Sequence, residues 1–315
     1  MKKKLSLLII GGTGFFGKSI LDSFKRGLLE EFNINKILVL ARNTDRFKLE
    51  FPELISNCIE FINGDISNIT TLPDVDLVIH AATSTNMNEY LLNFNKFRKE
   101  DIDNAISNYC KLAPIYNSKS KILYCSSGIV YGKQSLKLEK ISEDHRLKKD
   151  LNNLSLEKKI YCLVKRHAEK EIINLGKIGL NVSIARCFTF SGKYLPKNQQ
   201  YAYGNFIKQA EKGEKIIVKT NGIVYRSYMT ADDMVKSLFC ILFQSSEICP
   251  IINVGSDKQI AIHDLAKLIA NKYNVDYEYL ITDKNNIIDR YVPDISKLNK
   301  IQNLFFGLKN NTNNE

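Results

Sequence analysis

The sequence predicts an α/β protein built on a doubly wound parallel sheet, with a smaller subdomain toward the C-terminus. Short, almost continuously apolar segments alternate with longer segments of helical pattern as far as Arg186. Apolar strands of this kind are typical of a parallel sheet covered on both faces, and the strand–helix alternation is typical of the doubly wound arrangement. A glycine-rich turn follows the first strand directly, where such sheets connect tightly to the first helix.

Each element is predicted from its apolar pattern and its length. Buried strands are expected at Leu5–Ile10, Ile37–Leu40, Cys58–Ile62, Leu77–Ile79, Ile122–Tyr124, Val182–Ala185 and Ile251–Val254. Helices are expected at Lys18–Glu30, Tyr90–Leu112, Ser155–Leu175 and Asp232–Phe243. After Arg186 the alternation weakens, which predicts a second unit. We expect residues 1–186 and about 229–256 to form the main domain, and about 187–228 and 257–315 to form the smaller subdomain.

Composition and charge exclude several classes of protein. The 315 residues carry 45 Lys and Arg against 34 Asp and Glu, a net charge of +11 that is dispersed apart from Lys2–Lys4. Without a basic stripe we expect no nucleic-acid partner and favour an anionic small substrate. No apolar run approaches the roughly 20 residues of a membrane span and no signal-peptide pattern is visible, so we expect a cytoplasmic protein without membrane insertion. The seven cysteines stand singly, which predicts neither a disulfide framework nor a metal site.

The glycine-rich turn has the spacing GxxGxxG and leads from the first strand into a helix. This spacing is a variant of the dinucleotide-binding fingerprint of the Rossmann fold. One glycine allows a tight turn, one allows the backbone to approach a pyrophosphate, and one allows the helix to pack closely on the strand. Free N–H groups at the helix start can bind phosphate oxygens. The alternative is an ordinary tight turn. We predict cofactor contacts at Gly11, Thr13, Gly14, Phe15, Phe16 and Gly17.

The end of the second strand indicates which dinucleotide is bound. Versions that bind NAD carry an acidic residue there for the ribose 2′-hydroxyl. This chain has Ala41 and Arg42 instead, and no carboxylate before Asp45. Arg42 can bind a 2′-phosphate, with Arg46 as a possible second cation, so NADP(H) is favoured over NAD(H). The alternative is that Arg42 is simply solvated.

Two further strand ends offer cofactor contacts. Asp65, after the third strand, can accept a hydrogen bond from an adenine amino group, and Ile66 can pack on the adenine ring. Ala81 and Ala82, after the fourth strand, are small enough for the cofactor to pass over the strand end. Because nothing in the sequence partners His80, we expect it to be a packed or hydrogen-bonded residue and not a catalytic base.

Three residues form a candidate reaction centre. Tyr161 and Lys165 are four residues apart in a predicted helix, so they share one helix face. A nearby ammonium group stabilises a tyrosinate and brings the tyrosine closer to useful acid–base chemistry. Ser127, at the end of the fifth strand, can hydrogen-bond a carbonyl or hydroxyl oxygen beside it. A YxxxK pair alone occurs by chance, but its combination with the glycine turn, Asp65 and Ser127 is specific.

With these motifs the chain resembles the extended short-chain dehydrogenase/reductases, specifically the NAD(P)-dependent sugar epimerase/dehydratase family. The resemblance covers nearly the whole chain and includes the stretches SSGIVYG, YCLVK, IARCFTFSG, YGNFI, YRSYMTADDM, INVGS and YVPDISK. It implies that Ser127, Tyr161 and Lys165 are catalytic and that Lys165 also binds the nicotinamide ribose. It further implies a homodimer, formed through the helices Tyr90–Leu112 and Ser155–Leu175 of each subunit.

The same resemblance implies a nucleotide-sugar site in the smaller subdomain. Asn205 would lie near a phosphate and Arg226 would contact the diphosphate. Asp294 would lie near the nucleotide, with Arg290 beside it. Thr189 stands where many members carry Asn, so contacts to the sugar need not transfer. A forked guanidinium suits phosphate oxygens, which supports the role of Arg226; the alternative for Arg226 is a structural ion pair.

The residues after Ser127 separate the reactions known in the family. Its 4,6-dehydratases usually carry an acidic pair there to eliminate water, whereas this chain has Gly128 and Ile129, so elimination would lack its acid and base. We therefore expect NADP(H)-dependent reduction of a keto group on a nucleotide-activated 4-keto-6-deoxy sugar. The alternative is a nucleotide-sugar C4 epimerase with tightly bound NAD(P). A protein with the fold but without chemistry is disfavoured, because Tyr161 and Lys165 are intact.

Overall fold

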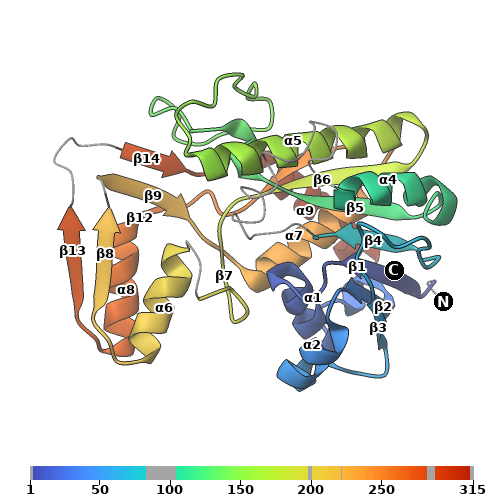
Figure 1. The fold of residues 1–315 in the computed structure, drawn as a ribbon, viewed down its shortest axis with the longest axis horizontal. Helices are drawn as coiled ribbons and strands as arrows, with labels where there is room; N and C mark the ends of the chain where they lie inside the picture. Colours follow the sequence, from blue (N-terminus) through green and yellow to red (C-terminus); the bar gives the residue numbers. More distant parts are fainter. Residues whose placement is uncertain (1–2, 83–103, 198–200, 221, 282–287, 313–315) are drawn as a thin grey trace.

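A seven-stranded parallel sheet forms the centre of the molecule (Figure 1). The computed structural model describes residues 3–82, 104–197, 201–220, 222–281 and 288–312. The strand order is β11-β6-β5-β4-β1-β2-β3, with every neighbouring pair parallel. The strands are β1 (Leu5–Ile10), β2 (Ile34–Ala41), β3 (Ile59–Asn63), β4 (Leu77–His80), β5 (Lys121–Ser127), β6 (Asn181–Cys187) and β11 (Ile251–Val254). Every predicted strand is present, so the doubly wound α/β fold is confirmed.

Strand β1 shows why these apolar segments form a central sheet. Leu7, Leu8, Ile9 and Ile10 are each 0% exposed. Because side chains alternate across a strand, Leu7 and Ile9 join the apolar core on one face of the sheet, while Leu8 and Ile10 join the core on the other. Each side chain buried in this way stabilises the fold by about 1.5–3 kcal/mol. Both faces of the sheet therefore need a cover of helices.

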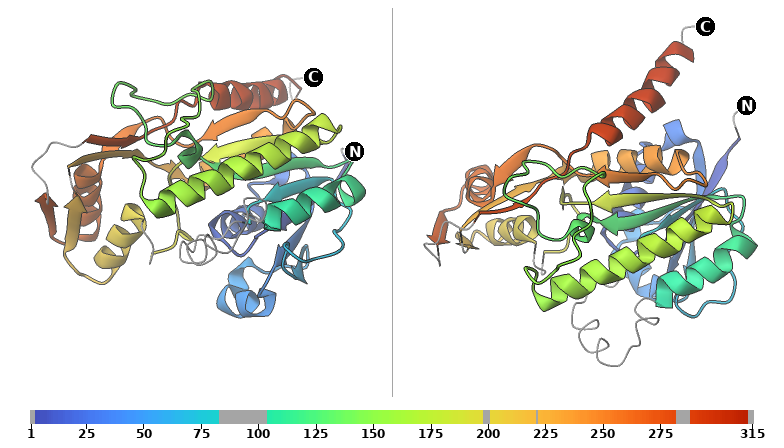
Figure 2. Two further views of the ribbon diagram at one scale, coloured as in Figure 1. Left: turned by 45° about the horizontal axis from the view of Figure 1, so that its top comes forward. Right: turned by 90° about the horizontal axis from the view of Figure 1, so that it is seen from above.

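Helices cover both faces, as Figure 2 shows. One face is covered by α1 (Phe15–Lys25), α2 (Thr44–Glu50), α7 (Ala231–Phe243) and α9 (Ser296–Thr312). The other face is covered by α4 (Asn104–Tyr116) and α5 (Leu156–Lys177). The predicted helices Ser155–Leu175 and Asp232–Phe243 match α5 and α7 to within two residues at each end. Much of the predicted helix Tyr90–Leu112 lies outside the described residues.

Helix α1 begins and ends earlier than the predicted helix Lys18–Glu30. It starts at Phe15, directly after Gly14, and ends at Lys25. Gly27 has a φ angle of 79°, a left-handed conformation that commonly ends helices. A short 3-10 helix, η1 (Glu30–Phe32), follows. The first turn of α1 therefore lies at the glycine-rich turn itself.

A smaller subdomain is built from the segments that flank α7 and β11 in the sequence (Figure 1). It contains a three-stranded sheet in the order β12-β9-β14 and a two-stranded sheet of β13 and β8, with two helices. Phe206, Ile216 and Leu265 belong to its own buried core. These elements are α6 (Ala202–Glu211), β8 (Ile216–Thr220), β9 (Ile223–Ser227), β12 (Gln259–Ala261), α8 (Ile262–Tyr273), β13 (Tyr277–Ile281) and β14 (Ile288–Tyr291). Short connecting elements are η2 (Pro52–Leu54), η3 (Gly128–Tyr131), β7 (Phe190–Ser191) and β10 (Met229–Thr230).

The C-terminal helix α9 packs on the main sheet, which differs from the predicted assignment of residues 257–315 to the smaller subdomain. Leu298 is 0% exposed within the core that also contains α1 and α7. The ring centroid of Phe305 lies 5.1 Å from that of Phe32 and 5.7 Å from that of Phe243. These aromatic contacts place α9, which follows the last strand of the smaller subdomain in the sequence, in the main domain.

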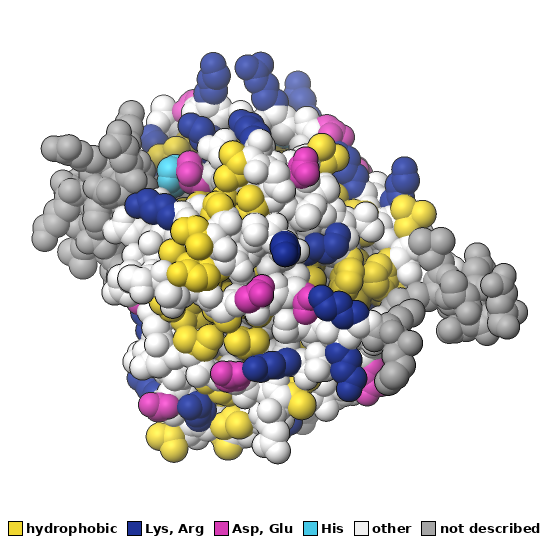
Figure 3. All heavy atoms as spheres, turned by 90° about the vertical axis from the view of Figure 1, so that its right-hand side faces the viewer, with side chains coloured by type: hydrophobic (Ala, Val, Ile, Leu, Met, Phe, Trp, Pro, Cys, Tyr) yellow, Lys and Arg dark blue, Asp and Glu magenta, His cyan; other side chains and the backbone are white. Residues whose placement is uncertain are grey.

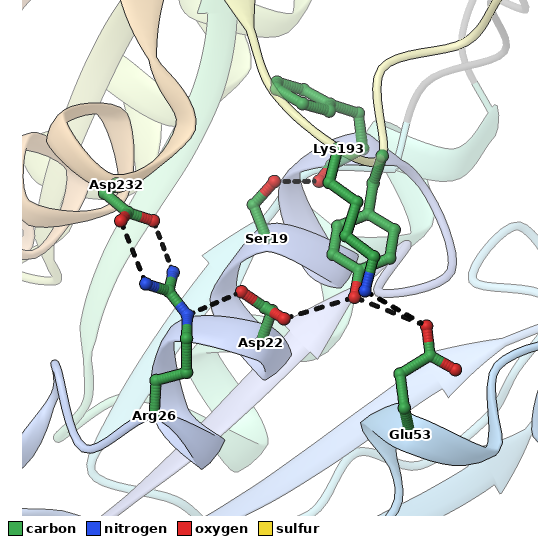
Figure 4. Close-up of polar contacts among 8 residues, drawn as sticks. Ser19, Asp22, Arg26, Glu53, Lys193 and Asp232 are labelled. Atoms are coloured by element: carbon green, nitrogen blue, oxygen red, sulfur yellow. Dashed lines mark hydrogen bonds and ion pairs between the residues drawn. The ribbon is translucent and has the colours of Figure 1, made fainter. Parts of the chain in front are cut away.

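Polar contacts connect α1 to its neighbours (Figure 4). Arg26 Nη1 donates to Asp232 Oδ2 at 3.0 Å, and Arg26 Nε donates to Asp22 Oδ2 at 2.8 Å. The Tyr194 hydroxyl donates to the other Asp22 oxygen at 3.2 Å. The hydrogen bond from Arg26 lowers the pKa of Asp232 below its ordinary value. Exposed ion pairs of this kind are each worth about 1 kcal/mol or less, so they orient α1 more than they stabilise the fold.

Charged side chains are mixed in sign on the face that Figure 3 shows. Lys and Arg side chains there lie among Asp and Glu side chains and form no continuous stripe. This agrees with the dispersed charge of the sequence. In the part of the chain that the structure describes, no helix combines the length and apolar character that a membrane span requires.

Candidate active site

The glycine-rich turn brings the ends of β1 and β4 into close contact. Gly11 has a φ angle of +82°, and a Cβ atom there would lie 2.6 Å from Ala82 Cα. The Gly11 N–H donates to Leu40 O at 2.9 Å, which ties the turn to the end of β2 as well. Both the left-handed backbone and the close approach require glycine. The turn therefore lies directly over the edge where the parallel strands end.

The other two glycines of the motif have different roles. A Cβ atom on Gly17 would lie 2.1 Å from Gly12 O, so this glycine allows α1 to pack against the turn. Gly14 is exposed and precedes α1, and among the described residues a Cβ atom there would meet only Gly11 O, at 3.5 Å. The described residues therefore leave room beside Gly14. That room lies at a helix N-terminus, where free N–H groups favour an anion, so the turn fits a cofactor pyrophosphate.

Phe15 and Phe16 are half-buried and pack on Phe190. The ring centroids of Phe15 and Phe190 are 6.1 Å apart, and those of Phe16 and Phe190 are 5.7 Å apart. Both rings join the core between α1 and the sheet. Their side chains thus hold α1 in place, and the cofactor contacts predicted for these two residues would come from their backbone N–H groups. Thr13 is half-buried in the turn.

Arg42 follows β2 directly and its side chain is exposed. Among the described residues, no carboxylate forms an ion pair with it. Arg46, the second predicted cation, donates from Nε to Glu50 Oε1 at 2.7 Å. Asp45 pairs with Lys48 at 3.2 Å on the same short helix. Arg42 is therefore the more available cation for a 2′-phosphate at this strand end.

Asp65 lies at the same edge of the sheet, and Ile66 lies mostly beneath it. Asp65 Oδ1 accepts a hydrogen bond from the Ser67 N–H at 2.9 Å, and no described residue bonds its second oxygen, which could accept from a ligand. Ile66 is only 6% exposed and belongs to the apolar core, while Asn108 Nδ2 donates to its carbonyl oxygen at 2.8 Å. Ala81 is half-buried, and its N–H donates to Ile10 O at 2.9 Å. The ring contact predicted for Ile66 stays a prediction.

The candidate reaction centre lies where β5 ends beside α5. Ser127 is the last residue of β5, and its Oγ accepts from the Ile129 N–H at 3.3 Å. Tyr161 and Lys165 are one turn apart on α5, and Lys165 Nζ lies 5.9 Å from the centroid of the Tyr161 ring. Lys165 is 3% exposed and donates to Cys125 O at 2.8 Å. The ammonium group is thus held between Tyr161 and the strand that ends in Ser127.

A buried ion pair supports this arrangement and was not predicted from the sequence. Glu169 accepts hydrogen bonds from Arg186 Nε at 2.9 Å and Nη2 at 2.8 Å, and from Ser126 Oγ at 2.6 Å. Glu169 and Arg186 are 3% and 5% exposed. The contacts join α5, β5 and β6 beneath the reaction centre. The available signal was that Glu169 lies four residues after Lys165, on the same face of the helix.

The predicted substrate residues are spread over several elements. Arg226 Nη2 lies 2.5 Å from Asp289 Oδ2, so the alternative of an ion pair is realised in this structure. Arg290, on the strand that pairs with β9, contacts Leu138 O through Nη1 at 3.3 Å. Asp294 Oδ1 accepts from the Ser296 N–H, and hydrogen bonding by Ser296 lowers the pKa of Asp294.

Two predicted substrate residues differ in their exposure. The Thr189 hydroxyl donates to the carbonyl oxygen of Ser227, so it is occupied within the protein. Asn205 is exposed in the first turn of α6, and its N–H donates to Tyr201 O at 3.0 Å. The exposed Asn205 side chain has no hydrogen-bond partner among the described residues, whereas Thr189 helps to join the segment after β6 to β9.

Tyr291 reaches the reaction centre from the smaller subdomain and was also not predicted. Its hydroxyl is a hydrogen-bond partner of Ser127, and burial raises its pKa above the ordinary value. A Cβ atom on Gly128 would lie 2.6 Å from the Tyr291 hydroxyl and 2.7 Å from a ring carbon of Phe188. The position after Ser127 is therefore closed to a longer side chain in this structure.

Comparison with known proteins identifies relatives of several activities. The chain is 28% identical over 293 residues to a dTDP-D-glucose 4,6-dehydratase of Dictyostelium discoideum, an alignment covering 84% of this chain and 61% of the relative. It is 26% identical to UDP-glucuronic acid decarboxylase 3 of Arabidopsis thaliana, covering 94% of this chain and 83% of that protein. The chain thus spans less than two thirds of the length of the first relative.

Solved structures share the fold of this chain. A dTDP-glucose 4,6-dehydratase from Streptomyces venezuelae, with NAD and TYD bound, has a TM-score of 0.75 at 18% identity, covering 94% of this chain and 90% of that one. A UDP-glucose 4-epimerase from Thermotoga maritima has a TM-score of 0.74 at 18% identity, covering 94% and 92%. The family model that matches residues 7–255 is that of the NAD dependent epimerase/dehydratase family. This chain belongs to the NAD dependent epimerase/dehydratase family.

Proposed function

We propose that this protein is an NADP(H)-dependent enzyme that reduces a keto group on a nucleotide-activated 4-keto-6-deoxy sugar. The observation that carries the proposal is the buried ammonium group of Lys165, held between the Tyr161 ring and the strand that ends in Ser127. Such a cation favours the tyrosinate and so adjusts the tyrosine for proton transfer. The relatives named above act on nucleotide sugars according to their names, which supports this class of substrate.

The reduction needs a hydride on carbon and a proton on oxygen. When bound, NADPH would supply the hydride and leave as NADP+. Tyr161 gives its hydroxyl proton to the alkoxide that forms at the former keto oxygen. Ser127 donates a hydrogen bond to that oxygen, and Lys165 stabilises the tyrosinate that remains. The proton is then replaced from solvent, so that one hydride and one proton convert the ketone to the alcohol.

Two features support reduction over dehydration. Elimination of water needs an acid and a base near the sugar. The position after Ser127 is Gly128, and the Tyr291 hydroxyl and the Phe188 ring occupy the space that a side chain there would need. Arg42, exposed at the end of β2, supports NADP(H), the cofactor suited to net reduction.

The test is to mix the purified protein with NADPH and a panel of 4-keto-6-deoxy dTDP- and UDP-sugars. We expect stoichiometric loss of absorbance near 340 nm, with a matching reduced sugar by mass spectrometry. If no ketosugar consumes NADPH and two nucleotide sugars interconvert without added cofactor, the reductase proposal is wrong and the protein is a C4 epimerase.

Arg42→Ala tests the cofactor preference. We expect at least about a tenfold preference for NADPH over NADH in kcat/KM, which corresponds to about 1.4 kcal/mol, and its loss in the variant. Lys48→Ala is the matched control, because Lys48 is a nearby cation already paired with Asp45. Equal use of both cofactors by the wild-type enzyme would contradict the role of Arg42.

We also propose that two subunits associate through α4 and α5. Leu156 and Leu163 are 54% and 36% exposed, seven residues apart on α5, and Ile115 on α4 is 69% exposed. Residues seven apart lie on one helix face, so the pair offers an apolar surface to a second copy. Light scattering should show a dimer at micromolar concentration, and Leu163→Glu should give a monomer. A wild-type monomer would remove this proposal.

A further inference from the structure

The side chain that holds Lys165 from inside the sheet is Tyr124. Tyr124 lies in the middle of β5 and is 1% exposed. Lys165 Nζ lies 3.1 Å from the Tyr124 hydroxyl oxygen and 4.8 Å from the centroid of its ring. An ammonium group has three N–H donors, and burying it is costly unless those donors are satisfied. Tyr124 provides both an oxygen acceptor and an aromatic face to a cation that is almost fully removed from water.

The spacing of strand and helix explains how this contact forms. Tyr124 and Ser126 point to the same side of β5, and they contact Lys165 and Glu169, which are one turn apart on α5. Two residues along a strand span about 6.6 Å, and four residues along a helix span about 6 Å. Because these two spacings are nearly equal, both contacts between β5 and α5 can form at the same time. Ser127, the next residue of β5, faces the other way and belongs to the reaction centre.

Among the described residues, the imidazole ring beside Tyr124 is buried and uncharged. His80 is 0% exposed, and its ring centroid lies 5.7 Å from that of Tyr124 and 5.0 Å from that of Tyr109. Burial, with a smaller contribution from Lys165, lowers the pKa of His80 to about 3, so its imidazole is neutral at physiological pH. The titratable groups around Lys165 in the described part of the chain are Tyr161 and Glu169 on α5, Tyr124 and Cys125 on β5, His80 on β4 and Cys187 on β6.

We propose that Tyr124 is a positioning residue for the reaction: its hydroxyl group holds the ammonium group of Lys165 at the place from which it stabilises the ionised form of Tyr161. The inference rests on the proposed function, because it assumes that Tyr161 transfers a proton. Tyr124 does not touch the substrate in this scheme. Without the Tyr124 hydroxyl, the Lys165 ammonium group would lose one of its hydrogen bonds and its side chain would adopt several rotamers. It would then stabilise the ionised form of Tyr161 less.

Tyr124→Phe is the direct test, because it keeps the ring and removes only the hydroxyl. We expect kcat to fall about tenfold, with an unfolding midpoint within a few degrees of wild type. In the direction of reduction Tyr161 must be protonated, so activity is lost as pH rises through its pKa. Weaker stabilisation of the tyrosinate raises that pKa, and the alkaline limb of the pH profile should move by about one unit to higher pH.

Tyr109→Phe is the matched control. Tyr109 is also 0% exposed and also lies beside His80, but its hydroxyl has no hydrogen-bond partner among the residues that the structure describes. Removal of an unpaired buried hydroxyl should leave kcat and the pH profile unchanged and leave the unfolding midpoint equal or higher. If Tyr124→Phe behaves as Tyr109→Phe does, or loses activity only in proportion to lost stability with an unmoved alkaline limb, the inference is wrong.

A binding measurement separates this inference from the proposed function. Lys165 is also expected to hold the nicotinamide ribose, so the dissociation constant of NADPH, measured by fluorescence, should rise several-fold in Tyr124→Phe and not in Tyr109→Phe. If no ketosugar is reduced but this difference is found, the proposed function fails and the positioning of Lys165 stands. If ketosugars are reduced and both variants bind and react as wild type, the positioning role alone fails.

Discussion

Alanine substitutions at Gly17 and Gly14 should affect different properties, stability in the first case and cofactor binding in the second, although both glycines belong to the same motif. In Gly17→Ala the new Cβ would lie 2.1 Å from Gly12 O and 2.3 Å from Gly12 Cα. These are backbone atoms, so no side-chain rotation relieves the contact. In Gly14→Ala the new Cβ would lie 3.5 Å from Gly11 O, an ordinary contact, and the φ angle of −82° suits any residue.

The structure allows the magnitudes to be compared. Alanine gains about 1 kcal/mol over glycine within a helix. Overpacking a close contact typically costs about 1–3 kcal/mol, and more where the backbone must move. For Gly17→Ala we expect a net loss of at least about 2 kcal/mol, or roughly 4–8 °C in Tm. For Gly14→Ala we expect little change in Tm, but at least about a tenfold weaker binding of NADPH, because the Cβ enters the space left for the pyrophosphate.

Two measurements on each variant decide the matter: thermal unfolding by circular dichroism without ligand, and NADPH binding by fluorescence titration. A Gly17→Ala protein as stable as wild type would show that α1 does not pack against the turn as described. A Gly14→Ala protein that binds NADPH with wild-type affinity would show that the cofactor does not approach this glycine. A loss of stability in Gly14→Ala equal to that in Gly17→Ala would refute the separate roles of the two residues.

Three further substitutions test other parts of the site. Asp289→Asn should strengthen the binding of UDP or dTDP several-fold in calorimetry, because it frees Arg226 for a diphosphate; weaker binding would mean that Asp289 orients Arg226 instead. Glu169→Gln should lower the free energy of unfolding in urea by about 3 kcal/mol, since it leaves the charge of Arg186 buried without its partner, and an unchanged midpoint would contradict this. Tyr161→Phe should lower kcat on the order of 10²-fold at nearly unchanged cofactor affinity, since it removes only the proton donor; a similar loss of cofactor affinity would make Tyr161 structural.

Much of the candidate site could be predicted because its signals are local. The glycine spacing after β1 and the i, i+4 pair of Tyr161 and Lys165 lie within single elements or one turn, where backbone geometry alone brings the residues together. The topology of a parallel sheet then places the ends of β1 to β5 on one edge. By contrast, the α1 boundaries were predicted poorly, because the end of the helix depends on the left-handed backbone at Gly27 and not on an apolar pattern.

The sequence by itself determined the doubly wound class, the order of the sheet strands along the chain and the candidate cofactor and proton-transfer residues, since apolar periodicity and glycine geometry act over short distances. Only the tertiary structure decided that Tyr124 holds Lys165, that Asp289 pairs with Arg226, and that Tyr291 reaches Ser127. These partners come from different elements, often far apart in the chain. Which of them meet depends on how strands and helices from separate parts of the chain pack against one another, and no periodic pattern in the sequence carries that information.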